Sequence, residues 1–213
     1  MTTVSSTYRI LGYDGEQARQ LLFDIENEAP VWVRNGASTA AVQQVLDDTI
    51  PGNVIGASVE GDPSSDDPWE YRDVQIVDRT TLDFVDGTNY CPGPAEETWR
   101  ERDDNVGITV FEDDQTGQPQ VELQVHPKEH DGQQVWDDIR VGRIPIEPWF
   151  RPQNTEQGES LSVLPQGAHH LIVQNPPDHP FLIFHSFPEG SAQFFQEYRT
   201  DLIEHVRAPT QTR

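Results

Sequence analysis

The stretch APVWVRNGASTAAVQQVLDDTIPGNV, residues 29–54, passes from a strand pattern to a helix pattern and decides the fold expected for the first part of the chain. Residues 31–34 predict a short strand that ends in a turn at Asn35-Gly36. Residues 38–49 predict a helix that Ser38 can cap. Its apolar residues fall on one helical face, as expected for a helix that packs on a core: Val42, Val45, Leu46 and Ile50.

Segments of alternating polarity lie on both sides of this stretch and predict further strands. They are residues 8–13, 19–25, 54–59 and 69–85, the last with a bulge near Asp78 where the alternation weakens. Three strands, a helix and two strands is the element order of an OB-type small barrel. A split barrel or another small β-roll would give the same order.

The pattern changes after the proline-rich stretch CPGPAEE, residues 91–97, which reads as a linker. Beyond it, two hairpins and three helices predict helices packed on an antiparallel sheet. We therefore expect an α+β fold in two domains: an OB-like β-barrel over residues 1–90 and an α+β domain over residues 91–213. A chain of 213 residues can bury enough surface to fold without disulfides.

Charge is the strongest compositional signal. The chain has 37 acidic and 14 basic residues, a formal net charge of −23, and a single lysine, Lys128. Self-repulsion at such a charge destabilises a compact chain, and molar salt screens it. The acids are spread over segments with clear apolar periodicity, which argues against a disordered acidic tail. The composition therefore predicts a halophilic protein whose acidity does not by itself identify a partner.

Three observations bear on location. The N-terminal residues lack the basic end and apolar core of a secretory signal. No apolar run has membrane-spanning length. The lone Cys91 cannot form an internal disulfide, which fits a reducing compartment. We expect a cytoplasmic protein with no membrane partner.

The first candidate binding site lies on the predicted third strand. Trp32 and Arg34 occupy the strand face opposite Val31 and Val33. In OB barrels the outward face of the second and third strands carries the ligand, and tryptophan and arginine there can stack on bases or contact phosphates. Arg19 could join them only if a bulge turned it outward. A contact with another protein or domain is the alternative use of this face.

The second candidate site is a histidine pair. If PPDH, residues 176–179, forms a four-residue hairpin loop, then His170 lies directly opposite His185 on one sheet face. Such a pair could share a metal ion or transfer a proton. A register slip of one residue would destroy the pairing.

Other sequence features favour structural roles. HPKEH, residues 126–130, spaces two histidines four apart, but Pro127 prevents a helix, so a solvated turn is expected. Cys91 has no basic neighbour to lower its pKa, which argues against a catalytic thiol. No nucleotide-binding glycine motif or GxSxG motif occurs, and the sequence does not define a cofactor.

Three stretches together resemble an uncharacterised haloarchaeal family, one known only as a domain of unknown function. They are DRTTLDFVDG at residues 78–87, RIPIEPWF at residues 143–150 and PPDHPFLIF at residues 176–184. The resemblance implies a lineage and a compartment, and it carries no catalytic residues to this chain.

Three functions are consistent with these features. The first is a non-catalytic binding or adaptor module that holds a protein partner on the Trp32 and Arg34 face or in the groove between the two domains. The second is an RNA- or single-strand-binding protein that uses the same face. The third is a metal-assisted hydrolase built around His170 and His185.

Overall fold

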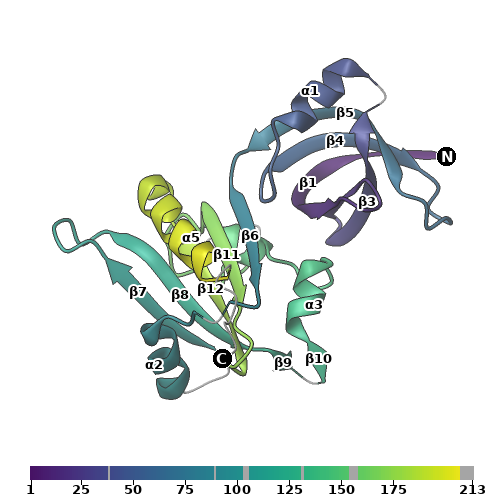
Figure 1. Cartoon of the computed structure of the whole chain (residues 1–213). Coiled ribbons are helices and arrows are strands. Elements are labelled where there is room, and N and C mark those ends of the chain that lie inside the picture. The colour runs from purple at the N-terminus through teal and green to yellow at the C-terminus, as the bar shows by residue number, and fades with distance from the viewer. Residues whose placement is uncertain (38, 89, 103–105, 131, 154–157, 207–213) are drawn as a thin grey trace. The chain divides into compact units, whose positions relative to one another are not determined.

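The structure, a computed structural model, describes residues 1–37, 39–88, 90–102, 106–130, 132–153 and 158–206. Its strands and helices form an α+β fold that is mostly sheet (Figure 1). The chain divides into two compact units. Unit 1 comprises Met1–Leu82 and Asp138–Glu147, and unit 2 comprises Asp83–Asp137 and Pro148–Arg213.

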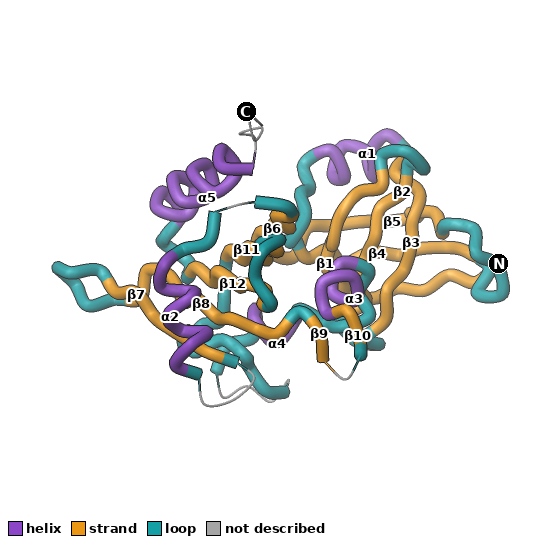
Figure 2. The backbone as a smooth tube through the Cα atoms, turned by 60° about the horizontal axis from the view of Figure 1, so that its bottom comes forward, coloured by secondary structure: helices purple, strands orange, loops and turns teal. Residues whose placement is uncertain are grey.

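Unit 1 is built on a five-stranded sheet that closes on itself in the order β1-β2-β3-β5-β4 (Figure 2). Neighbouring strands are antiparallel except β3 and β5, which pair in parallel. The strands are β1 (Thr2–Asp14), β2 (Arg19–Asp24), β3 (Ala29–Ala37), β4 (Val54–Gly61) and β5 (Trp69–Asp78).

One helix, α1 (Ala40–Asp47), connects β3 to β4. Its N-cap is Thr39, whose hydroxyl oxygen accepts a hydrogen bond from the Val42 backbone N–H at 3.3 Å. The predicted cap, Ser38, lies outside the described residues. The predicted turn at Asn35-Gly36 is wrong because β3 continues to Ala37. The Asn35 N–H donates to the Ala18 carbonyl at 2.7 Å, which keeps this part of β3 extended.

The core of unit 1 fills the inside of the closed sheet. Alternate residues of each strand point inward, and α1 adds its apolar face from one end. The largest side chains of this core are Tyr8, Ile10, Leu22, Ile55 and Tyr71, each at most 1% exposed.

The stretch from Trp69 to Val85 forms two strands instead of the single bulged strand that its sequence predicts. β5 ends at Asp78, and β6 (Thr81–Asp86) begins after a two-residue break. Thr80 explains the break, since its hydroxyl donates to the Gly52 carbonyl at 2.6 Å and accepts from Arg9 instead of facing a neighbouring strand. The weakened alternation therefore marked the end of a strand.

Unit 2 is built on a second five-stranded sheet, in the order β6-β11-β12-β8-β7. Its remaining strands are β7 (Gly107–Glu112), β8 (Pro119–Pro127), β11 (His170–Asn175) and β12 (Phe181–Phe187). A two-stranded ribbon, β9 (Glu129–His130) with β10 (Gln133–Gln134), follows β8.

Two helices pack on one face of this second sheet. α2 (Gly93–Glu101) covers Leu123, Val125, Phe181 and Ile183. α5 (Ala192–Val206) covers the same face further along, over Val121, Ile172 and Phe187. Both helices were expected from the sequence, and both lie on this face because the residues they cover alternate along β8 and β12.

The other face is covered by irregular chain. Trp149, in the short helix α4 (Glu147–Phe150), stacks on Phe184 of β12 with ring centroids 4.4 Å apart. Glu122 of β8, fully buried, accepts hydrogen bonds from the Ser162 hydroxyl at 2.7 Å and from the Val163 N–H at 2.7 Å. These bonds hold the covering segment in place and satisfy the buried carboxylate.

Unit 1 also includes the second half of α3 (Val135–Arg140) and the turn that follows it. A Cβ atom at Gly142 would lie 3.1 Å from side-chain atoms of Leu11 and Pro30, so this turn lies directly on the outer face of the sheet. Among the helices of the described residues, none is long and apolar enough to cross a membrane.

Candidate functional site

Trp32, Arg34 and Arg19 come together on the outer face of β2 and β3. Arg19 pairs with Arg34 across the two strands, and Leu21 pairs with Trp32. The Arg19 guanidinium carbon lies over the Trp32 ring, 4.0 Å from its centroid. A cation at this distance over an indole is attracted by the ring electrons, so the two side chains form one continuous surface.

Arg19 faces outward although β2 has no bulge. The expectation that Arg19 would need a bulge to reach this face was therefore wrong. The interior residues of β2 are Gln20 and Leu22, whereas Leu21 and Phe23 lie on the outer face with Arg19. Alternation alone could not identify the inner set, because both faces of this strand are buried. The turn around Gly142 covers the outer face near Phe23.

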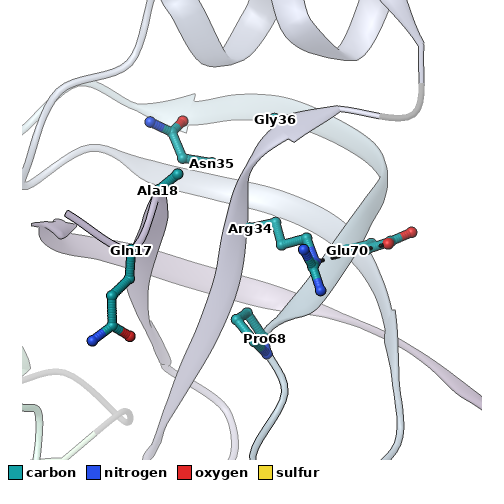
Figure 3. Close-up of a pocket in the computed structure, with 7 residues that line it drawn as sticks. All are labelled: Gln17, Ala18, Arg34, Asn35, Gly36, Pro68 and Glu70. Carbon is teal, nitrogen blue, oxygen red and sulfur yellow. Dashed lines mark ion pairs between the residues drawn. The ribbon is translucent and has the colours of Figure 1, made fainter. Parts of the chain in front are cut away.

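A pocket of about 610 Å³ opens beside this surface, where the seam between β3 and β5 is irregular. Val33 pairs with Trp69, and Ala37 pairs with Tyr71. Between these two pairs β3 advances by four residues, whereas β5 advances by only two. The β3 residues between these two pairs, Arg34, Asn35 and Gly36, line the pocket. Its lining comes from the β1–β2 turn, from β3 and from the start of β5 (Figure 3): Gln17, Ala18, Arg34, Asn35, Gly36, Pro68 and Glu70.

The charges at this pocket are paired but accessible. Arg34 faces Glu70 across the opening, with Nε and Oε1 3.9 Å apart and side chains 59% and 50% exposed (Figure 3). A second arginine, Arg72, also pairs with Glu70, with Nη2 and Oε2 3.4 Å apart. Arg19 pairs with Asp14, with Nε and Oδ2 3.1 Å apart. An exposed pair at 3.9 Å contributes little to stability, so a ligand can take the place of either partner at low cost.

Backbone N–H groups and Arg19 also define the state of Asp14 in the β1–β2 turn. The pKa of Asp14 is lowered, first by a hydrogen bond from the Gln17 N–H and then by the Arg19 side chain. Asp14 therefore keeps its charge and keeps Arg19 in position over Trp32.

The histidine pair expected on the second sheet does not form in the predicted register. His170 pairs with Phe187, and His185 pairs with Ile172. The paired residues closest to the loop are Gln174 and Ile183, so the loop is longer than the four residues expected. Pro176 and Pro177 cannot donate hydrogen bonds to a neighbouring strand, which explains the longer loop. A metal site at His170 and His185 stays a prediction, but the strand register on which it was based is not the one observed.

Each of these two histidines has a packing partner of its own. The His170 ring stacks on Phe195 of α5, with centroids 4.3 Å apart. His185 is fully buried, and its Nε2 lies 2.9 Å from the Gln174 side-chain oxygen. The Tyr198 hydroxyl lies 3.0 Å from His185 Nδ1. Burial lowers the pKa of His185 to about 3, so this ring is neutral at ordinary pH.

The HPKEH stretch is part sheet and part ribbon, so the expected solvated turn is wrong for its first half. The His126 ring lies at the edge of Trp149 and against Phe184, and its Nε2 is 2.9 Å from the Gln124 side-chain oxygen. Burial lowers the pKa of His126 to about 4. His130, at the end of β9, is exposed.

A group of potential metal ligands lies elsewhere in unit 2. The ligand atoms of Cys91, Glu96 and His179 all lie within 4.8 Å of one another. Burial, followed by the charge of Glu96, raises the pKa of the Cys91 thiol to about 11, so the thiol is protonated at neutral pH when no metal is bound. Of these three residues, the sequence pointed only to Cys91. A histidine in a predicted hairpin loop and a cysteine before a predicted helix do not define a metal site unless the fold brings them together.

Together these features define a sheet-rich α+β protein with two compact units, one of which presents a polar pocket beside an arginine–tryptophan surface. The chain belongs to a family of unknown function, DUF6663, whose model matches residues 1–188. This agrees with the resemblance to an uncharacterised family found in the sequence. No curated protein and no solved structure matches the chain.

Proposed function

We propose that this protein is a non-catalytic binding module and that the pocket beside Arg34 holds a short, extended segment of a partner protein. The observation that carries the proposal is that one accessible pocket is lined by the Arg34–Glu70 pair and by two carboxamide residues, Gln17 and Asn35. Each carboxamide offers a donor and an acceptor, which is what a peptide group needs. Arg34 and Glu70 can form ion pairs with side chains of opposite charge on the same segment.

An OB-type architecture for unit 1 is part of this proposal. The strand order, the parallel pairing of β3 with β5 and the single helix between β3 and β4 all support it. The pocket lies between the β1–β2 turn and the β4–β5 connection, and ligands of OB barrels bind beside the equivalent loops. The domain division at residue 90 also stays a prediction.

A halophilic, haloarchaeal and cytoplasmic setting completes the proposal. It is supported by the formal net charge of −23 and the single lysine. In molar salt, ion pairs at an exposed pocket are strongly screened, so carboxamide hydrogen bonds and packing would supply most of the affinity.

RNA or single-stranded nucleic acid is the second candidate ligand. The observation in its favour is the Arg19–Trp32 stack, which resembles the stacking surfaces that hold bases. Against it, Arg19 and Arg34 both face carboxylates, and the exposed loop before β5 carries Asp62, Asp66 and Asp67. Phosphates would be repelled by this loop, so we favour a polypeptide.

Binding to an array of short peptides tests the proposal. We expect Arg34→Ala to weaken the peptides that bind by about tenfold or more, as substitution of a central arginine commonly does. Arg79→Ala is the matched control, since Arg79 is also ion-paired and its side chain is 58% exposed against 59% for Arg34. Equal binding by the two variants would refute the pocket. Retention of a single-stranded RNA in place of peptides would support the second candidate.

A further inference from the structure

We propose that Cys91, Glu96 and His179 form a binding site for a zinc ion or a similar divalent transition-metal ion. Their three ligand atoms lie within 4.8 Å of one another, which is close enough for one ion to reach all of them after small side-chain rotations. The three residues come from separate segments of unit 2: the loop after β6, helix α2, and the hairpin loop between β11 and β12. This proposal does not depend on the proposed peptide pocket, which lies in unit 1.

The ligand types identify the class of metal. A thiolate and an imidazole together select zinc and related transition metals, whereas magnesium and calcium need sites made of oxygen ligands. A carboxylate as the third ligand is common for zinc. Three protein ligands leave a fourth tetrahedral position, which a water molecule or a small anion can occupy.

The present distances require a modest contraction. Zinc bonds of 2.0–2.3 Å in a tetrahedron place ligand atoms about 3.3–3.6 Å apart. His179 Nε2 lies 3.9 Å from Glu96 Oε1, so this pair is within about 0.6 Å of that separation. The Glu96 side chain is 46% exposed, which leaves room for it to rotate toward the other two ligands. Its exposed pair with Arg100, at 3.6 Å, opposes this rotation only weakly.

Lys128, the only lysine in the sequence, holds the hairpin loop that carries His179. The Lys128 N–H donates to the Pro180 carbonyl at 3.0 Å, and the Lys128 ammonium donates to the Pro176 carbonyl. The His179 N–H closes the loop by donating to the same Pro176 carbonyl at 3.4 Å. The backbone on both sides of His179 is therefore tied to Lys128, the residue that follows β8, and metal binding need not order it.

The loop that carries Cys91 is fixed in a similar way. The Gln174 side-chain amide donates to the Tyr90 carbonyl, and the Gln174 side-chain oxygen in turn contacts His185. Cys91 itself packs beside the cluster that includes Ala95 and Phe181. Preordered ligands of this kind lower the entropy cost of binding an ion.

Titration of the full-length chain, purified without a histidine tag, with Zn²⁺ and with Co²⁺ tests the site. Co²⁺ bound to a thiolate gives a near-ultraviolet charge-transfer absorption, and Cys91 is the only cysteine in the chain, so this band reports on the proposed site alone. We expect one equivalent of metal to bind with this band. Removal of one ligand should weaken binding by at least about tenfold, since even outer partners of metal ligands contribute this much.

Two substitutions and one control decide the outcome. Glu96→Gln should weaken Zn²⁺ binding without affecting the fold, because the side chain is half-exposed. His179→Gln should do the same, whereas His130→Gln, an exposed histidine outside the site, should leave the affinity unchanged. Absence of the thiolate band, or equal Zn²⁺ affinity in Glu96→Gln, His179→Gln and the wild type, would overturn the proposal.

Discussion

At the scale of single residues, Arg9 is a buried charge of unit 1 that several hydrogen bonds hold in place. Its side chain is buried, and it donates to the Glu147 carboxylate at 2.6 and 3.0 Å through two nitrogens. It also donates to the Gly52 carbonyl and the Thr80 hydroxyl, both at 2.6 Å. These four hydrogen bonds offset the desolvation of the guanidinium, and they tie β1 to the break before β6 and to the turn that ends at Glu147.

Breaking this pair from one side should be costly. Arg9→Met leaves the Glu147 carboxylate buried without its partner, so we expect the free energy of unfolding to fall by about 3–5 kcal/mol in chemical denaturation. The double variant Arg9→Met with Glu147→Leu removes both charges and should recover most of that loss. A single variant that is as stable as the wild type would contradict the buried pair.

At the scale of elements, the sequence predicted most strands and helices but not their partners. Alternation placed Trp32 and Arg34 on one face correctly, because it is a local property of the strand. The β3–β5 seam that forms the pocket depends on how β3 residues match Trp69 and Tyr71, and no local pattern encodes that register. For this reason Glu70 was absent from the predicted site.

The strand register of the second sheet also differs from the one expected from the sequence. The β11–β12 hairpin was expected, yet its register is shifted from the predicted one, because the two prolines after Asn175 extend the loop. This shift separates His170 from the position opposite His185 and leaves His179 at the loop, near Glu96. The candidate metal ligands could not be grouped from the sequence because the hairpin and α2 meet only in the folded sheet.

The network of β11, β12 and α5 around His185 gives a prediction about pH. The pKa of His185 is lowered to about 3 by burial, from about 6.5 in an unfolded chain. The unfolded state therefore binds a proton first as pH falls, so the stability from the neutral ring is complete above pH 6.5 and is lost between pH 6.5 and 3. At pH 5 the loss from His185 should reach about 2 kcal/mol.

Urea unfolding at pH 7, 6 and 5 measures this effect. His185→Gln removes the titrating group, so its stability should fall less steeply with acidification than that of the wild type. Tyr198→Phe removes the hydrogen bond at Nδ1 but keeps the ring, so it should lose about 1 kcal/mol at every pH and keep the wild-type slope. A wild-type slope in His185→Gln would rule out His185 as the source.

At the scale of the whole molecule, charge dominates. With a formal net charge of −23, neighbouring surface carboxylates repel one another in dilute buffer, and only 14 basic residues are present to offset 37 acidic ones. The Debye length is about 10 Å at 0.1 M salt and about 3 Å at 1 M. Raising the salt over this range should therefore remove most of the repulsion between neighbouring surface charges.

We expect the protein to unfold when KCl is diluted from molar to millimolar concentration, with tryptophan fluorescence as the readout. Sucrose also favours compact states but screens no charge, so it should protect less than KCl if repulsion is the cause. A variant with three exposed carboxylates neutralised, Asp66→Asn, Glu97→Gln and Glu112→Gln, should unfold at a lower KCl concentration. If sucrose protects as well as KCl and this variant keeps the wild-type midpoint, then screening is not the cause, and the acids would have to act through specific contacts instead.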